Sequence, residues 1–319
     1  MRILFVTATR IGDAVLSAGL LSHLIARYPD AWLTIAAGPA AAPLFAAVPG
    51  LERLVVVRKR RFALHWPALY ARTVARRWDL IVDLRGSALA WLLWARERFV
   101  MGKGDPAEHR VRQLGRLFRL EPPPSPTIWT APRYDRVAER LVPPGSPVLA
   151  IGPAANWRGK QWRAERFAEL AQRLTAPDAP FAGARVAVLA AAHERPQAEP
   201  LLAALPPGRV IDLVGQTDLL TAAAVLRRCA LFIGNDTGLM HIAAAAGVPT
   251  LGLFGPSPVE QYAPWGRCTG VVLTTPSGAA LFPPDFDHRT TDTLMDSLSV
   301  AQVEAAACEL WQRAISQAA

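Results

Sequence analysis

The sequence has few cysteines and no long apolar runs. Three cysteines stand at 229, 268 and 308, too far apart for a disulfide framework or the C-x-x-C pair of a zinc site. The longest uncharged apolar stretch, 88–95, ends at Arg96, well short of the roughly 18 residues that cross a bilayer. The apolar start turns polar at Thr7, too early for a secretion signal. We therefore expect a soluble protein of a reducing compartment, the cytoplasm.

Two common phosphate-binding fingerprints are also missing. Neither a G-x-G-x-x-G dinucleotide loop nor a G-x-x-x-x-G-K-[ST] phosphate loop occurs in the chain. Internal repeats of short period and low-complexity tails are missing as well. A nucleotide ligand, if the protein binds one, must be held by other loops.

Acidic residues are fewer than basic ones. The chain has 26 Asp and Glu against 35 Lys and Arg, a net charge of +9, while 51% of its residues are hydrophobic and 19% charged. Such a composition is that of a globular protein and excludes a disordered one. The positive balance favours anionic partners, such as nucleic acid, phosphorylated ligands or an anionic membrane face.

Short apolar runs alternate with amphipathic stretches, the pattern of βα units around parallel sheets. At about 150 residues per domain, 319 residues suggest two domains. In the first half the pattern predicts strands at 3–7, 32–36, 54–57, 80–83 and 99–102, and helices at 13–28 and 68–77. In the second half it predicts strands at 148–152, 185–190, 210–212, 231–234 and 250–254, and helices at 164–174, 219–228, 238–246 and about 300–316.

A proline-rich stretch at 121–147 separates the two halves and is interpreted as a linker. The prediction is a first domain over 1–147 and a second over 148–319, with the terminal helix a candidate to pack back on the first. Two doubly wound α/β domains leave a cleft at the carboxyl ends of their strands, where ligands of such sheets bind. The loops at those ends therefore carry the candidate site residues.

Asp13 follows the first predicted strand at the start of the first helix. An aspartate here is either an N-cap of that helix or a carboxylate that takes a proton from a substrate hydroxyl. In the second half, Asp236, Thr237 and Gly238 follow an apolar strand and open a helix, which makes either an anion site or a capped helix. The loop 152–162 presents Arg158 and Lys160 between two tryptophans, either toward a diphosphate or simply to solvent.

Six segments together resemble one known family. They are 2–6 (RILFV), 11–16 (IGDAVL), 78–87 (WDLIVDLRGS), 160–162 (KQW), 234–245 (GNDTGLMHIAAA) and 253–256 (LFGP). In register over nearly the whole chain, they look like glycosyltransferase family 9, the ADP-heptose:lipopolysaccharide heptosyltransferases. The resemblance implies the GT-B fold, with the acceptor on the first Rossmann-like domain and the nucleotide-sugar on the second.

The resemblance also implies an inverting transfer without metal or cofactor, from ADP-heptose to a lipopolysaccharide core acceptor. It makes Asp13 the general base, with Gly12 beside it on the acceptor side, and it assigns the donor diphosphate to Lys160. The resemblance further assigns the diphosphate to the residues that open the helix at 238–246, which are Asp236, Thr237 and Gly238. His241 matches a family position and is a candidate nucleotide contact, although a histidine within a buried helix is also an ordinary structural residue. Family members often carry a glutamate that binds the nucleotide ribose after the strand predicted at 185–190; this chain departs from that pattern, and Glu194 is the nearest match.

The segment 276–293 departs from the family pattern. Many relatives carry a cysteine cluster around 274–295, and this chain has no cysteine there. Two alternatives therefore stay open: a non-catalytic nucleotide-sugar-binding protein of the same fold, and a GT-B enzyme that uses another nucleotide-sugar. Nucleic acid is not an expected partner, because no recognition motif accompanies the positive charge.

A strongly basic stretch lies in the first domain. Eight cations and a single acid, Glu52, fall within residues 51–78. We predict that Arg58, Lys59, Arg60 and Arg61, assisted by Arg96 and Arg98, either hold the enzyme on the cytoplasmic face of the inner membrane or bind acceptor phosphates. The simpler interpretation is a solvated surface with ordinary core aromatics. The expected partner is an anionic lipopolysaccharide core or lipid A acceptor.

Overall fold

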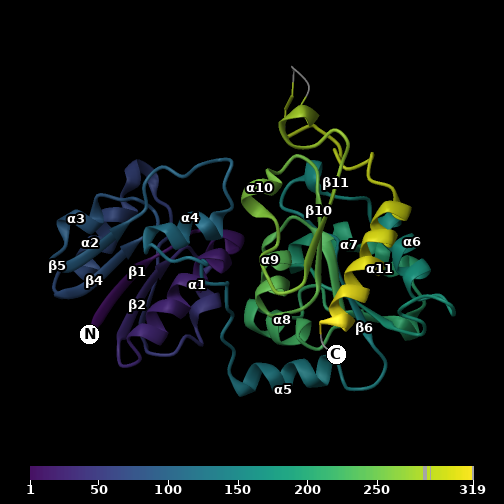
Figure 1. Ribbon diagram of the computed structural model, residues 1–319, viewed down its shortest axis with the longest axis horizontal. Helices are drawn as coiled ribbons and strands as arrows, with labels where there is room; N and C mark the ends of the chain where they lie inside the picture. The colour runs from purple at the N-terminus through teal and green to yellow at the C-terminus, as the bar shows by residue number, and fades with distance from the viewer. Residues whose placement is uncertain (283–285, 288, 318–319) are drawn as a thin grey trace. The chain divides into compact units, whose positions relative to one another are not determined.

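The computed structural model describes residues 1–282, 286–287 and 289–317, and the chain forms two compact units, Met1–Ala131 and Pro132–Ala319. Each unit has a parallel β-sheet flanked by helices (Figure 1). The predicted doubly wound α/β architecture is confirmed. Within the described ranges no helix is both long and apolar enough to cross a membrane.

The sheet of the first unit has five parallel strands in the order β3-β2-β1-β4-β5. They are β1 (Arg2–Val6), β2 (Trp32–Ala37), β3 (Leu51–Val56), β4 (Trp78–Asp83) and β5 (Ala95–Val100). Ile3, Leu4 and Phe5 of the central strand are fully buried, because a strand of a parallel sheet is covered on both faces. The strand order reverses between β1 and β4, so the loops that follow these strands diverge and open a crevice between them.

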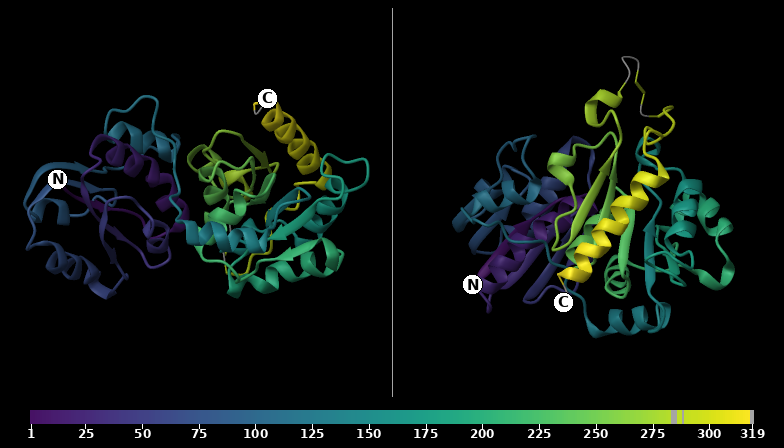
Figure 2. Two further views of the ribbon diagram at one scale, coloured as in Figure 1. Left: turned by 90° about the horizontal axis from the view of Figure 1, so that it is seen from below. Right: turned by 45° about the vertical axis from the view of Figure 1, so that its right-hand side comes forward.

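Helices cover both faces of this first sheet. Helix α1 (Ile11–Arg27) and α4 (Arg110–Leu117) lie on one side, and α2 (His65–Thr73) lies on the other (Figure 2). Phe99 of β5 stacks on Phe118 at the end of α4, with ring centroids 4.0 Å apart. The single-turn α3 (Leu89–Leu92) packs into the same hydrophobic core as α2.

The sheet of the second unit has six parallel strands in the order β11-β10-β9-β6-β7-β8. They are β6 (Val148–Gly152), β7 (Arg185–Val188), β8 (Val210–Asp212), β9 (Leu231–Asn235), β10 (Thr250–Phe254) and β11 (Thr269–Leu273). Here the order reverses between β6 and β9. The loops after these two strands, which carry Lys160 and Asp236, therefore flank the crevice of this sheet.

Seven helices of the second unit have been assigned within the described ranges. They are α5 (Pro132–Leu141), α6 (Ala164–Leu174), α7 (Arg195–Ala204), α8 (Leu219–Leu226), α9 (Gly238–Ala245), α10 (Val259–Tyr262) and α11 (Val300–Ser316). Helix α11 lies alongside α6 and the β10–β11 edge (Figures 1 and 2). Its Trp311 contacts Phe181 with ring centroids 4.9 Å apart, which adds an aromatic pair to the main core of the unit.

Several elements differ from the sequence-based expectation; among them, helices α3, α4 and α10 were not predicted. The stretch 121–147 contains helix α5, which begins at Pro132; proline is tolerated in a first helical turn because the N–H it lacks has no helical partner there. Helix α7 was not predicted, since Pro196 and Pro200 obscure its pattern. Strand β11 was missed because it lies at a sheet edge and is only partly buried, which weakens its apolar signal.

Candidate functional site

The centre of the candidate donor site is an ion pair at the carboxyl edge of the second sheet. Lys160 Nζ lies 2.7 Å from Asp236 Oδ2, and the two side chains are 24% and 9% exposed. Asp236 follows β9, and Lys160 ends a single 3-10 turn in the loop after β6. A buried carboxylate without a partner costs several kcal/mol, so Asp236 fixes the ammonium group at this edge.

Helix α9 begins beside this pair. Thr237 is its N-cap residue, with φ −144° and ψ 173°, and within the described part of the chain its side chain makes no capping hydrogen bond. The first backbone N–H groups of a helix have no helical acceptors and carry partial positive charge. Together with Lys160 they form a site suited to a phosphate group.

Asn235 fastens the Lys160 loop to the end of β9. Its Oδ1 accepts a hydrogen bond from Trp162 N at 3.1 Å, and its Nδ2 donates to Pro153 O at 2.7 Å. Asn235 is fully buried, so both hydrogen bonds replace lost contacts with water. The asparagine of the Asn-Asp-Thr-Gly motif thus holds both ends of the loop that carries Lys160, a positioning role that sequence reasoning missed.

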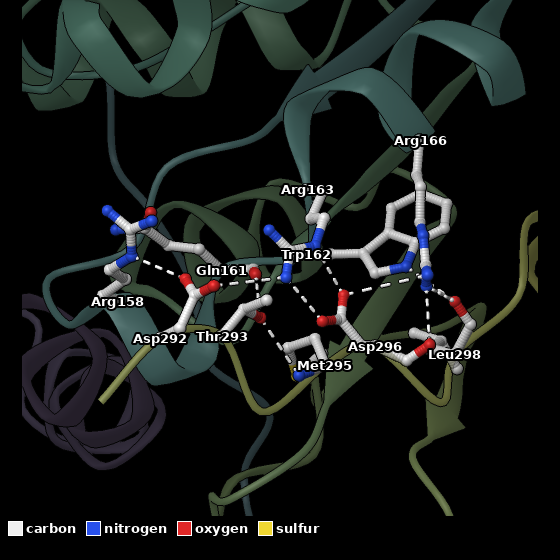
Figure 3. Close-up of polar contacts among 10 residues, drawn as sticks. All are labelled: Arg158, Gln161, Trp162, Arg163, Arg166, Asp292, Thr293, Met295, Asp296 and Leu298. Carbon is white, nitrogen blue, oxygen red and sulfur yellow. Dashed lines mark hydrogen bonds and ion pairs between the residues drawn. The ribbon is translucent and has the colours of Figure 1, made fainter.

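A second fastening comes from the segment 292–298, which begins at the end of the divergent segment 276–293. Arg158 Nε lies 2.7 Å from Asp292 Oδ1, and Arg163 Nη2 lies 2.6 Å from Asp296 Oδ2 and 3.3 Å from Asp292 Oδ2 (Figure 3). Arg166 donates to the backbone oxygens of Asp296 and Leu298. This strap, residues 292–298, therefore connects by ion pairs to both sides of Lys160.

Backbone groups strengthen the same connection. Gly159, the residue just before Lys160, accepts a backbone hydrogen bond from Leu294 N at 3.1 Å. The indole N–H of the buried Trp162 donates to Leu298 O at 2.9 Å, and Thr293 Oγ1 donates to Gln161 O. A Cβ at Gly159 would lie 2.6 Å from the Trp157 indole, so glycine lets this ring lie against the turn. Trp162 thus anchors this loop to the core of the second unit.

The strap carboxylates are ionised throughout the neutral range. The hydrogen bond from Arg158 is the largest of the effects that lower the pKa of Asp292 to about 2 from 3.8, and the hydrogen bond with Arg163 lowers the pKa of Asp296. A carboxyl group whose pKa is lowered by folding stabilises the folded state at every pH above its ordinary pKa. This stabilisation is lost as the pH falls toward the folded-state pKa. Near pH 7, salt rather than pH is therefore the variable that weakens the strap.

Asp13 and Gly12 occupy the first turn of α1 in the first unit. The helix begins at Ile11 with Arg10 as its N-cap, so Asp13 is its third residue. The alternative that Asp13 is the N-cap is wrong. Its half-buried carboxylate lies after β1, at the strand-order reversal of its sheet.

The two candidate nucleotide residues have local partners. Glu194 Oε2 accepts a hydrogen bond from Ala191 N at 2.8 Å after β7, so this carboxylate stabilises its own turn. His241 is 4% exposed within α9, and its Nε2 lies 3.9 Å from Asp236 Oδ1. Two hydroxyls after β10 and β11, Ser257 and Thr274, are buried without a hydrogen-bond partner among the described residues. No pattern in the sequence indicates them.

The basic stretch of the first unit is exposed and borders a cavity. The side chains of Arg58, Lys59, Arg60 and Arg61 all lie at the surface. A cavity of about 440 Å³ between β3 and α2 is lined by Arg58 and Arg60 together with His65 and Arg72. The arrangement offers several guanidinium groups to one anion. Within the described residues, no group of three or more His, Cys, Asp or Glu side chains is placed to hold a metal ion.

Comparison with known proteins agrees with this arrangement. The sequence model described as glycosyltransferase family 9 (heptosyltransferase) matches residues 85–281, more than half of the chain. The chain is 24% identical over 307 residues to the lipooligosaccharide heptosyltransferase 2 of Haemophilus influenzae, covering 83% of this chain and 86% of that protein.

Two solved structures have the same fold. A family 9 glycosyl transferase from Veillonella parvula superposes with a TM-score of 0.79 at 20% identity, covering 98% of this chain and 97% of that one. The E. coli ADP-heptose lps heptosyltransferase II gives a TM-score of 0.75 at 22% identity, covering 98% and 99%.

Two Rossmann-like units with these loops define a glycosyltransferase of the GT-B fold. The chain belongs to glycosyltransferase family 9.

The strap predicts a measurable effect on the Lys160 loop. In the double variant Asp292→Asn/Asp296→Asn, amide hydrogen exchange of residues 158–163 should rise several-fold, because the carboxylates that hold Arg158 and Arg163 are removed. Exchange in β6 should stay unchanged. The matched control is Glu169→Gln/Glu304→Gln, which removes the exposed ion pairs of Arg173 on α6 and should leave the loop as it is. Equal exchange in both double variants would contradict the fastening role.

Proposed function

We propose that this enzyme transfers a heptose from an ADP-activated donor to a hydroxyl of the lipopolysaccharide core, with inversion and without a metal ion. The observation that carries the proposal is the Lys160–Asp236 ion pair at the start of α9, within the family's Asn-Asp-Thr-Gly motif. Two relatives support the substrates: one is a lipooligosaccharide heptosyltransferase, and another is an ADP-heptose lps heptosyltransferase.

Charge on the leaving group is met by protein groups. When the acceptor oxygen attacks the anomeric carbon, the bond from that carbon to the β-phosphate oxygen breaks, and ADP leaves with its electron pair. Lys160 and the N–H groups of Gly238 and the residues after it neutralise this charge, with Asp236 and Thr237 shaping the turn. Glu194 and His241 are assigned to the nucleotide end of the donor.

Asp13 accepts the proton of the acceptor hydroxyl as the new bond forms. A carboxylate in the first turn of α1 keeps its negative charge at low cost, because the helix N-terminus favours anions. Gly12 beside it lets a sugar approach the backbone closely. One displacement at the anomeric carbon with one base gives inversion.

The acceptor is anionic, and the enzyme works at the cytoplasmic face of the inner membrane. Arg58 and Arg60 line the cavity, and a guanidinium group can bind a phosphate or carboxylate through two parallel hydrogen bonds. Lys59 and Arg61 extend the positive surface next to it. The membrane location is proposed because the acceptor is a lipid.

A donor screen tests the proposal as a whole. Purified protein would be given ADP-heptose, UDP-sugars and GDP-sugars in turn, each with a lipid A-core acceptor, and product would be followed by mass spectrometry. We expect transfer from ADP-heptose, with the opposite anomeric configuration in the product. If the protein transferred sugar only from UDP- or GDP-sugars, the assignment of ADP-heptose as donor would be wrong.

Lys160→Ala should weaken donor binding and lower turnover, because the diphosphate loses its ammonium partner and Asp236 loses its cation. Such an uncompensated charge can cost about 3–5 kcal/mol, so thermal unfolding must show that the variant is folded. Lys160→Arg, which keeps the charge, should retain part of the ADP affinity measured by calorimetry. Full ADP affinity in a folded Lys160→Ala protein would refute the role.

Activity should survive EDTA, since Lys160 and the α9 terminus supply the positive charge. The sequence does contain one Asp-x-Asp pair, at 285 and 287, a pattern able to bind a divalent cation; Asp287 is described by the structure and residue 285 is not. Initial rates would be compared in EDTA and in Mg²⁺. Strict Mg²⁺ dependence would overturn the metal-free assignment.

Asp13→Asn should lower kcat by about 10²–10⁴-fold, the usual contribution of a positioned base. The change removes the charge and keeps the shape, so the Kd for ADP should be unaltered, because the donor residues belong to the second unit. Single-turnover rates across pH would separate proton transfer from product release. Wild-type turnover in the variant would rule out Asp13 as the base.

Replacing Arg58, Lys59, Arg60 and Arg61 by serine should raise the KM for the anionic acceptor, because the positive charge beside the cavity is lost. The parent's KM should increase with salt, and the quadruple variant's should be less sensitive. Donor hydrolysis in water, measured without acceptor, should be the same for both proteins. An unchanged KM at low salt would leave these residues as an ordinary solvated surface.

A further inference from the structure

The first unit exposes a group of large apolar side chains that no proposed step uses. Trp91, Leu92 and Trp94, between β4 and the start of β5, are 69%, 66% and 59% exposed. Soluble proteins rarely gather large apolar side chains at the surface, and such groups commonly mark a binding surface. These three stand within four consecutive residues.

Their exposure follows from how the segment is anchored. Leu89, Ala90 and Leu93 are buried and pack in the same core as Ile81 of β4. Because α3 is one turn long, the residues between these anchors point away from the sheet. The tryptophans therefore cannot turn into the core without unpacking it.

Guanidinium groups lie over both exposed indole rings. The Arg98 Cζ atom is 6.0 Å from the centre of the Trp91 ring, and Arg77 Cζ is 5.6 Å from that of Trp94. Arg98 also donates to Ala90 O at 2.8 Å and to Leu93 O at 2.9 Å, which fixes its position. The rings and the cations thus form one surface, held together in part by cation–π attraction.

This surface is positive because strand alternation sorts the charges of β5. Phe99 stacks on α4, so its face of the strand is opposite to α3. Arg96 and Arg98 then lie on the α3 side, and Glu97 lies on the other. The segment 66–78, which supplies Arg77, contains no acidic residue. The aromatic–basic face is defined as Trp91, Leu92, Trp94, Arg77, Arg96 and Arg98.

We propose that the aromatic–basic face docks the enzyme on a bilayer that contains anionic lipids. Tryptophan favours the depth of lipid headgroups, where its ring is apolar and its N–H meets water. Arginine pairs with lipid phosphates through two N–H groups. A second copy of the chain is disfavoured, since two such faces would bring like charges together. The inference rests on the proposed lipid acceptor and leaves Arg58–Arg61 to bind that acceptor.

Vesicle sedimentation of the full chain tests the face directly. The triple variant Trp91→Ala/Leu92→Ser/Trp94→Ala should bind vesicles of phosphatidylethanolamine and phosphatidylglycerol at least about tenfold more weakly than the parent. The matched control is Trp32→Ala, which removes a tryptophan 57% exposed on β2 and should bind like the parent. Arg77→Ser/Arg96→Ser should lose the preference for these vesicles over phosphatidylcholine, in a salt-dependent way.

Three readings would overturn the proposal. One is parental vesicle binding by the triple variant, with circular dichroism confirming its fold. Another is an equal loss in Trp32→Ala, which would make binding a general property of exposed tryptophan. The third is a parent dimer that the triple variant dissociates while vesicle binding persists, which would make the face a self-association surface. Vesicle binding is measured without a sugar donor and does not depend on transfer. A failed transfer assay would therefore count against the proposed function and not against membrane docking by the aromatic–basic face.

Discussion

The arrangement of the second unit's site depends on one buried carboxylate. Asp236 lies at the end of β9 with its side chain 9% exposed, and its charge must be balanced nearby. The nearest cation, Lys160, comes from a different loop, 76 residues earlier in the chain. Bringing that ammonium group to within 2.7 Å requires the loop after β6 to adopt one shape. Asn235 and the strap supply the hydrogen bonds that keep it there.

The parallel sheets explain why these groups meet at one edge. All strands of a parallel sheet end on the same side, and the reversal of strand order between β6 and β9 separates the loops that follow them. Gly234 ends up against Gly152 across this reversal, since an added Cβ would lie 2.8 Å from the Gly152 carbonyl oxygen. The same reversal in the first unit places Asp13 after β1. Site position is thus a consequence of topology in both units.

Much of this could be predicted from sequence, because apolar runs and turn residues are local signals. Strand β6 and helix α6 begin and end where expected, since an uninterrupted apolar run and a clear apolar stripe mark them. Helices α5 and α7 were hidden by their prolines, of which Pro132 and Pro196 lie in first turns and Pro200 lies inside α7. The family motifs supplied Lys160 and Asp236. The strap could not be foreseen, because Asp292 and Asp296 pair with arginines about 130 residues earlier, and no local pattern records such a partner.

The strap holds its segment without any cysteine, since the chain has none between 274 and 295. A metal or disulfide cluster would hold the segment through a few strong bonds, whereas here two carboxylates, three guanidinium groups and several backbone hydrogen bonds share the work. Exposed ion pairs contribute little one by one, but they act together with the buried Trp162 and Leu298, which keep the strap packed on the core. The buried contacts therefore set where the loop lies, and the ion pairs set how tightly its Lys160 end is held. Salt screens the ion pairs and not the buried contacts. Ionic strength should therefore change the mobility of the Lys160 loop more than the stability of the second unit.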